Sequence, residues 1–291
     1  MTSTTHRVPG VDGVELHVAV DGPADAPAVV LLHGFPQTHL MWRHVAADLA
    51  ADHRVIRPDL RGYGASDKPV DTGGTYAKRT MAADVVAVAR HLGVERFALA
   101  GHDRGALVAI RAGLDHPDAI SHLTILDVLP VPEMWDVLHG VDAAVAFHLY
   151  LMAQPPGLPE AMIAGAPDAF FGFFLDAWGG SFPDDVRAEY LRASRGAVPS
   201  IVADYRASAT VDLELDRASR AAGEQLAMPV TVVQQDWGAA LGFDAAALWK
   251  PWAPDLTHRT LDAGHFMAET APEEIVALLR RPAAPSSTRA R

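Results

Sequence analysis

Short runs of β-branched and aliphatic residues alternate along the chain with longer stretches whose apolar positions recur at helical spacing. Residues 28–32 (AVVLL) form a continuous apolar run, which predicts a buried strand. Residues 81–92 (MAADVVAVARHL) show helical spacing, and Gly93 supplies a stop signal. This alternation predicts an α/β fold, with a mostly parallel sheet covered by helices on both faces. Further strands are expected at residues 54–57, 97–100, 123–126, 229–233 and 258–261, and a closing helix at 273–280.

The alternation stops between about residues 130 and 223. Strand candidates give way there to prolines, short helical pieces and an aromatic cluster that ends at Trp178. We therefore expect a helical cap inserted after the sixth strand, with the active site between cap and sheet. The predicted division of the chain is residues 1–130 and 224–281 for the core, 131–223 for the cap and 282–291 for a disordered tail.

Composition narrows the classes of partner. A length of 291 residues, with 49% hydrophobic and 21% charged residues, fits one large globular domain with an insertion. The formal net charge of −12 argues against nucleic acid, because phosphate contacts need a basic face. The chain has no cysteine, which excludes disulfides and agrees with a reducing compartment.

The start of the chain, MTSTTHRVPG, lacks the apolar segment of a signal peptide, and no apolar run approaches the ~20 residues of a membrane helix. We therefore expect a cytoplasmic protein with no membrane partner. The sequence also contains neither a metal-ligand cluster such as H-E-x-x-H nor a phosphate-binding glycine loop, so no metal and no organic cofactor is expected.

The most informative motif is FALAGHDRGA, residues 97–106. A predicted strand runs through Gly101-His102-Asp103-Arg104-Gly105 into a helix, which matches the G-x-S-x-G nucleophile elbow with aspartate in place of serine. Glycines are needed on both sides because a Cβ in so sharp a turn would collide with its neighbours. Taken alone, the pattern also fits an ordinary turn in which Asp103 caps the helix.

Three other segments fall in the order that an α/β-hydrolase requires. His33-Gly34-Phe35-Pro36 follows a strand, where this fold carries the second oxyanion-hole donor, so the backbone N–H groups of Phe35 and Arg104 are the predicted donors. Asp127 ends a predicted strand, and His265 follows another. The order nucleophile, acid, histidine is thus Asp103, Asp127, His265. Asp236 rivals Asp127 as the acid, because it follows the strand predicted at 229–233.

An aspartate nucleophile indicates attack on a saturated carbon of a small-molecule substrate. A serine that displaced a leaving group from such a carbon would form an unreactive ether, whereas Asp103 would form an ester that water, the co-substrate, can hydrolyse. His265 would take a proton from that water. Asp127 would orient the imidazole and stabilise the imidazolium.

Six motifs along the chain together suggest a family: HGFPQTHLMWR (33–43), PDLRGYGASDKP (58–69), GHDRG (101–105), ILDVLP (125–130), DYRA (204–207) and AGHF (263–266). They resemble the fluoroacetate and haloacetate dehalogenases, and the wider epoxide-hydrolase and haloalkane-dehalogenase group of α/β-hydrolases. The similarity covers about residues 7 to 280, and the LDVLP setting of Asp127 favours Asp127 over Asp236 as the acid.

This resemblance implies substrate-binding roles and a homodimer. Arg104 matches the first of two arginines that grip a substrate carboxylate, and His148 and Tyr205 match residues that contact the departing halide. Leu107 and Leu149 depart from the pattern, since the dehalogenases carry arginine and tryptophan there. Tyr205 also matches one of two proton-donating tyrosines of epoxide hydrolases, and the other aligns with His148. Both residues could instead be cap residues satisfied by local hydrogen bonds.

The leading hypothesis is a hydrolytic dehalogenase of small organohalides, of the haloacetate or 2-haloacid type. The alternative is an epoxide hydrolase that uses the same Asp103, His265 and Asp127. A third hypothesis is a ligand-binding protein that retains the hydrolase fold without turnover, because a fold alone does not fix a function.

Overall fold

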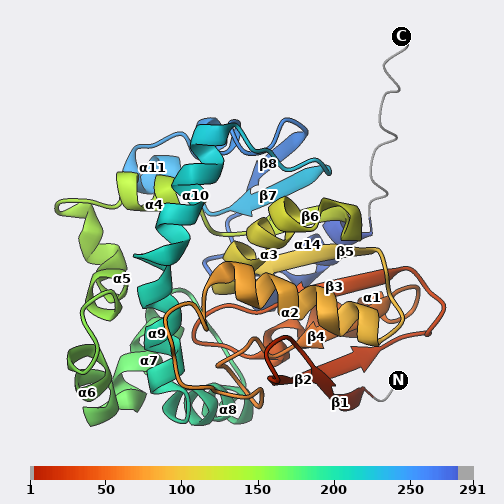
Figure 1. Cartoon of the computed structure of the whole chain (residues 1–291), viewed down its shortest axis with the longest axis horizontal. Helices are drawn as coiled ribbons and strands as arrows, with labels where there is room; N and C mark the ends of the chain where they lie inside the picture. The colour runs from red at the N-terminus through yellow and green to blue at the C-terminus, as the bar shows by residue number, and fades with distance from the viewer. Residues whose placement is uncertain (1–2, 281–291) are drawn as a thin grey trace.

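A computed structural model describes residues 3–280, so the tail predicted at 282–291 lies outside the described residues. Its centre is an eight-stranded sheet of order β1-β2-β4-β3-β5-β6-β7-β8 (Figure 1). Strands β3 to β8 run parallel, and β1 and β2 continue the sheet antiparallel. The strands are β1 Thr4–Pro9, β2 Glu15–Asp21, β3 Ala28–Leu32, β4 Arg54–Pro58, β5 Phe97–His102, β6 Ile120–Leu126, β7 Val230–Gln234 and β8 Leu256–Thr260.

The six strands expected from the sequence form the parallel part of this sheet, which confirms the predicted fold class. β1 and β2 were not predicted. Val8 is the one buried residue of β1, because this strand lies at the edge of the sheet. An edge strand with one buried position lacks the apolar run that identifies a strand such as β3, in which Val29 to Leu32 are all buried.

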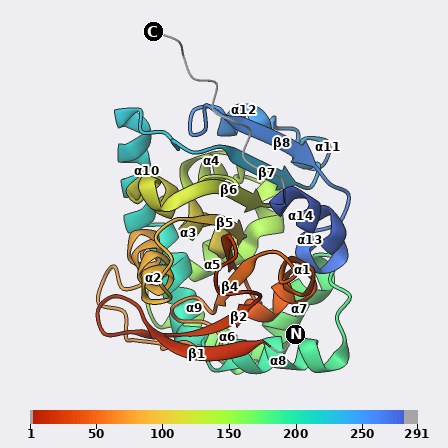
Figure 2. The same cartoon turned by 90° about the vertical axis from the view of Figure 1, so that its right-hand side faces the viewer.

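Helices cover both faces of the sheet (Figure 2). α2 and α3 pack together on one face, and α1 and α14 pack together on the other. Among the described residues no helix is both long and apolar enough to span a membrane. The helices of the core are η1 His39–Trp42, α1 Arg43–Leu49, α2 Lys78–His91, α3 Arg104–Asp115, η2 Pro117–Ala119, α11 Trp237–Leu241, α12 Ala245–Trp249, α13 Met267–Thr270 and α14 Pro272–Leu279.

The helical cap lies between β6 and β7 in the sequence and forms a layer at one end of the sheet (Figure 1). This position agrees with the insertion predicted after the sixth strand, while the exact division at residues 130 and 223 stays a prediction. The elements of the cap are α4 Val131–Val137, η3 Asp142–Ala146, α5 Phe147–Met152, α6 Leu158–Gly165, α7 Pro167–Ala177, α8 Asp184–Arg195, α9 Val198–Ser208 and α10 Val211–Ala222.

Buried charges join the cap to the core. Lys78 of α2 forms ion pairs with Asp204 of α9 and, at 3.5 Å, with Asp212 of α10. Arg104 of α3 donates from Nε to Asp204 Oδ2 at 2.8 Å, and the Tyr63 hydroxyl donates to the same oxygen at 2.6 Å. Two cations and two carboxylates are thus enclosed together, which is the arrangement that buried charges require. This cluster fixes α9, and with it the residues of α9 that face the elbow.

Candidate active site

The strand–turn–helix between β5 and α3 has the geometry of a nucleophile elbow. Asp103 adopts φ 48° and ψ −115°, a conformation uncommon for a residue other than glycine and worth roughly 1–3 kcal/mol of strain. A Cβ on Gly101 would lie 2.4 Å from the carbonyl oxygen of Gly105, and one on Gly105 would lie 2.4 Å from that of His33. The two flanking glycines are therefore required by close backbone approach, as the sequence predicts.

The Asp103 carboxylate lies between the predicted oxyanion loop and the histidine. Oδ1 accepts a hydrogen bond from the Phe35 N–H at 2.7 Å, and Oδ2 lies 4.0 Å from His265 Nε2. Arg104 is the first residue of α3, so its N–H is among those that a helix leaves without an intrahelical partner. The structure thus brings the Phe35 N–H to the carboxyl group of Asp103, and the role of the Arg104 N–H as the second donor stays a prediction.

His265 is held by Asp127, which follows β6. His265 Nδ1 lies 2.7 Å from Asp127 Oδ2. Burial lowers the pKa of His265, but the hydrogen bond to Asp127 and the charges of Asp127 and Asp103 outweigh burial and raise it above its ordinary value. The other ring nitrogen, Nε2, is buried without a hydrogen-bond partner among residues 3–280 and faces Asp103. This geometry leaves Nε2 available to a proton.

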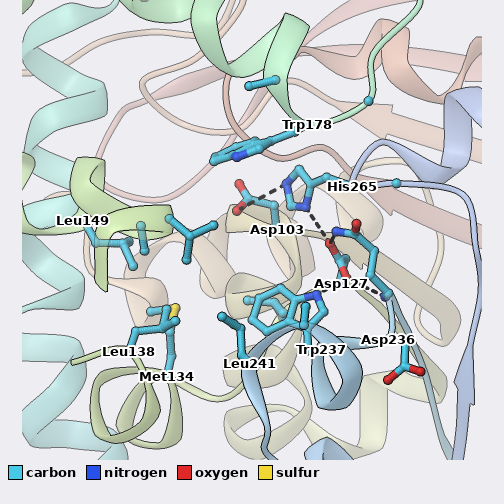
Figure 3. A pocket seen from close by; sticks show the side chains of 18 of the residues that line it. Asp103, Asp127, Met134, Leu138, Leu149, Trp178, Asp236, Trp237, Leu241 and His265 are labelled. Atoms are coloured by element: carbon cyan, nitrogen blue, oxygen red, sulfur yellow. Dashed lines mark hydrogen bonds and ion pairs between the residues drawn. The ribbon is translucent and has the colours of Figure 1, made fainter. Parts of the chain in front are cut away.

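Asp236, the rival for the acid position, has a different place. Its carboxylate accepts from the Ala239 N–H at 2.9 Å and so caps the N-terminus of α11. The side chain is turned away from His265 (Figure 3), and the residue is exposed. The structure therefore brings Asp127, and not Asp236, to the histidine.

His148 on α5 and Tyr205 on α9 come together beside the oxyanion loop. Their rings lie 5.5 Å apart, and both pack on Phe35, at 5.9 Å and 5.3 Å between ring centroids. Burial lowers the pKa of His148 to about 3, and burial together with the charge of Asp103 raises that of Tyr205 well above 10. Both side chains are therefore neutral at pH 7.

The polar atoms of this pair have no local partners. His148 Nδ1 and the Tyr205 hydroxyl are both buried without a hydrogen bond to any residue in the described part of the chain. Unsatisfied buried polar groups are rare in proteins, and each one needs an explanation. The alternative expectation, that local hydrogen bonds satisfy both residues, does not hold for these two atoms.

The guanidinium of Arg104 is engaged inside the protein. Besides the bond from Nε to Asp204, Nη2 donates to the Asp204 carbonyl at 2.9 Å and to the Ser208 hydroxyl at 2.6 Å. The guanidinium carbon also lies 4.0 Å from the centre of the Tyr205 ring. The carboxylate-binding role that the resemblance implies for Arg104 stays a prediction, and these contacts weigh against it.

A cavity of about 990 Å³ opens beside Asp103 and His265 (Figure 3). This volume is near the upper end of small-molecule sites, which span roughly 300–1,000 Å³. Leu107 and Leu149, the two positions that depart from the dehalogenase pattern, both line it. Other large apolar residues of its wall include Met134, Leu138, Trp178, Trp237, Leu241 and Leu261.

Sequence reasoning missed the part of this wall that follows β7. The indole of Trp237 borders the cavity, and its Nε1 donates to Asp127 Oδ1 at 3.0 Å. The only signal in the sequence was the position of this residue after a predicted strand, where we considered Asp236 as an acid. Trp178, at the end of the aromatic cluster seen in the sequence, also lines the cavity.

Three side chains with metal-binding groups meet elsewhere: His17, His39 and Asp59. Asp59 Oδ1 lies 2.8 Å from His39 Nδ1 and accepts from the His39 N–H at 2.8 Å, and Oδ2 accepts from the Ala65 N–H at 2.8 Å. These contacts satisfy the carboxylate within the protein, so the cluster has a structural explanation that needs no ion.

Known proteins are similar to this chain in both sequence and architecture. A family model described as the alpha/beta hydrolase fold matches residues 27–146. The chain is 36% identical to the fluoroacetate dehalogenase of Burkholderia sp, with 94% of this chain and 92% of the relative covered. It is 31% identical to the soluble epoxide hydrolase of Corynebacterium sp., with 94% and 96% covered. The crystal structure of ALR0039 from Nostoc sp PCC 7120 is similar with a TM-score of 0.90 and 34% identity, and the match covers 96% of this chain and 97% of that one.

Proposed function

Because the chain belongs to the α/β-hydrolase family, we propose that it hydrolyses a substrate at an electrophilic saturated carbon through an ester on Asp103. One observation carries this proposal: the elbow presents a carboxylate whose Oδ1 is held by the Phe35 N–H and whose Oδ2 faces His265 Nε2 at 4.0 Å. A carboxylate has no proton to lose, so it needs no base to attack carbon.

In the first step, Asp103 Oδ2 forms a bond to the substrate carbon, and the bond from that carbon to the leaving group breaks. The leaving atom takes the electron pair and becomes a halide or an alkoxide. His148 and Tyr205 supply neutral, dry N–H and O–H groups that lack protein partners, which suits them to stabilise this developing charge. An alkoxide would also take a proton, whereas a halide needs none.

In the second step, water attacks the carboxyl carbon of the ester and gives a proton to His265 Nε2. The carbonyl oxygen becomes an oxyanion beside the N–H groups of Phe35 and Arg104, and one such donor is worth roughly 3 to 4 kcal/mol of the barrier. The tetrahedral intermediate then collapses, and the alcohol leaves with the proton from His265. Asp103 is left as a carboxylic acid, and release of its remaining proton to solvent restores the carboxylate. Asp127 stabilises the imidazolium throughout.

The charge on Asp103 regulates the histidine during this cycle. Asp103 and Asp127 both raise the pKa of His265 in the free enzyme. An ester on Asp103 is neutral, so one of these two charges is lost when the intermediate forms. His265 then releases its proton more readily, and it becomes a base at the step that needs one.

For the substrate, we propose a small organohalide first, supported by the identity to a fluoroacetate dehalogenase over nearly the whole chain. A 2-haloacid would have to place its carboxylate near Arg104, whose guanidinium is already bound to Asp204, and beside Leu107 in place of a second arginine. The geometry therefore favours a neutral, apolar organohalide over a charged one.

A second candidate is an epoxide. The unpartnered Tyr205 hydroxyl favours it, because the ring oxygen that leaves an epoxide needs a proton donor and a halide does not. A cavity of about 990 Å³ with leucine and tryptophan walls also accommodates larger apolar epoxides. The soluble epoxide hydrolase that is similar over nearly its full length is consistent with this chemistry.

The experiment that tests the mechanism is intact-protein mass spectrometry of His265→Gln, incubated in turn with a haloalkane, chloroacetate and styrene oxide. We expect a stable adduct on Asp103 for each class that the wild type consumes, and none in Asp103→Asn. Halide release against diol formation by the wild type then separates the two substrate classes. A substrate that is consumed without any adduct would exclude the ester, and binding without turnover would favour the third hypothesis, a receptor. A cytoplasmic location and a homodimer stay predictions.

A further inference from the structure

The loop after β7 holds the triad acid. Asp127 Oδ1 accepts from the Gln235 N–H at 2.9 Å and from Trp237 Nε1 at 3.0 Å. Asp127 Oδ2 accepts from Gln235 Nε2 at 2.7 Å and pairs with His265 Nδ1 at 2.7 Å. Each carboxylate oxygen therefore has two partners, which leaves the carboxylate one orientation.

Trp237, like Gln235, also borders the cavity. Its indole forms part of the wall of the substrate cavity next to Leu241, opposite Met134 and Leu138 (Figure 3). α11 contains no buried residue, and the Trp237 ring packs on Phe243, which follows the helix, at 5.9 Å between ring centroids. The ring is only partly buried against the core, so its hydrogen bond to Asp127 also contributes to its position.

We propose that Trp237 is a positioning residue that links the substrate cavity to the catalytic histidine through Asp127. The indole N–H holds Asp127 so that Oδ2 faces His265, and the indole ring is the surface on which the apolar part of the substrate packs. The packing of a substrate on the indole rests on the proposed function. The hydrogen bond between Trp237 and Asp127 is a property of the free protein.

The physical consequence follows from the charge of the carboxylate. A hydrogen bond from Trp237 draws part of that charge toward the indole, so Asp127 holds the His265 proton less strongly than it otherwise would. Removal of this donor should strengthen the attraction between Asp127 and the imidazolium and raise the pKa of His265. A residue that only fills space would not change the titration of a histidine with which it makes no hydrogen bond.

Trp237→Phe is the test, because phenylalanine keeps an aromatic wall and removes the N–H. The matched control is Leu241→Ala, which alters the same wall without touching Asp127. The measurement is the NMR titration of the His265 ring in the free protein. We expect the midpoint to rise by several tenths of a unit in Trp237→Phe, which is a fraction of the worth of a hydrogen bond to a charged group, because the effect reaches His265 only through Asp127. The midpoint should stay unchanged in Leu241→Ala.

An unchanged midpoint in a folded Trp237→Phe protein would overturn the proposal. If this variant does not fold, the test is made on the wild type. The indole N–H resonance of Trp237 should move over the pH range in which His265 titrates. A resonance that stays fixed over that range would also overturn the proposal. The titration needs no substrate, so it holds even if no halide or epoxide is consumed. With an active substrate, the acidic limb of kcat should shift with the midpoint, while Leu241→Ala should raise KM only.

Discussion

The Asp204→Asn substitution should destabilise the protein, because it removes a charge from the buried cluster between cap and core. Asparagine retains the size of the side chain and its carbonyl acceptor but removes the negative charge that faces both Lys78 and Arg104. The cluster then encloses two cations with Asp212 as the remaining carboxylate, at 3.5 Å from Lys78. Removing one partner from a buried ion pair typically costs about 3–5 kcal/mol, because the other charge is left buried and uncompensated.

The assay is urea unfolding at pH 7, followed by two probes to establish a single transition. We expect the free energy of unfolding of Asp204→Asn to fall by about 3–5 kcal/mol. The control is Asp168→Asn, which removes the carboxylate of an exposed pair with Arg195, and the expected loss there is below about 1 kcal/mol. Equal, small losses in both variants would refute the view that buried charge joins the cap to the core.

The pH dependence of the free energy of unfolding is a second test of the same cluster. Burial raises the pKa of Asp204, but Arg104 and Lys78 outweigh it and hold that pKa well below its ordinary value. A carboxyl group with a lowered folded-state pKa stabilises the protein above its unfolded pKa, near 4, and this contribution disappears as the pH falls toward the folded value. The wild type should therefore lose stability below about pH 4 more steeply than Asp204→Asn does.

Three further predictions concern the proposed site. Asp103→Asn should lower the titration midpoint of His265 measured by NMR, because it removes one of the charges that raise the pKa of this histidine; an unchanged midpoint would contradict the proposed change during the cycle. Tyr205→Phe should slow substrate consumption by roughly 10- to 100-fold. The free energy of unfolding should be equal or higher, since the buried Tyr205 hydroxyl has no hydrogen-bond partner in the described part of the chain; a large loss of stability would contradict this. Leu107→Arg should raise activity on chloroacetate relative to a neutral haloalkane; a fall in both rates would show that charge in this wall does not select the substrate.

The sequence by itself determined the features that depend on local backbone. The apolar run of β3 and the strand–glycine–helix pattern around Asp103 each lie within a short window, and the structure has them where the pattern predicts. Asp103, Asp127 and His265 each follow a parallel strand, and parallel strands place their carboxyl ends at one edge of a sheet. The sequence therefore predicts that these three residues lie near one another. These signals were sufficient for the fold and for the elbow.

The tertiary structure decided which side chains meet. Asp127 and Asp236 both follow strands, and only the packing shows that His265, 138 residues further along, bonds Asp127 while Asp236 caps α11. The resemblance implied that Arg104 binds a substrate carboxylate, but its guanidinium binds Asp204, 100 residues further along the chain. Such pairings are selected by the cost of burying each charge, and that cost depends on neighbours from distant parts of the chain, which no local pattern contains.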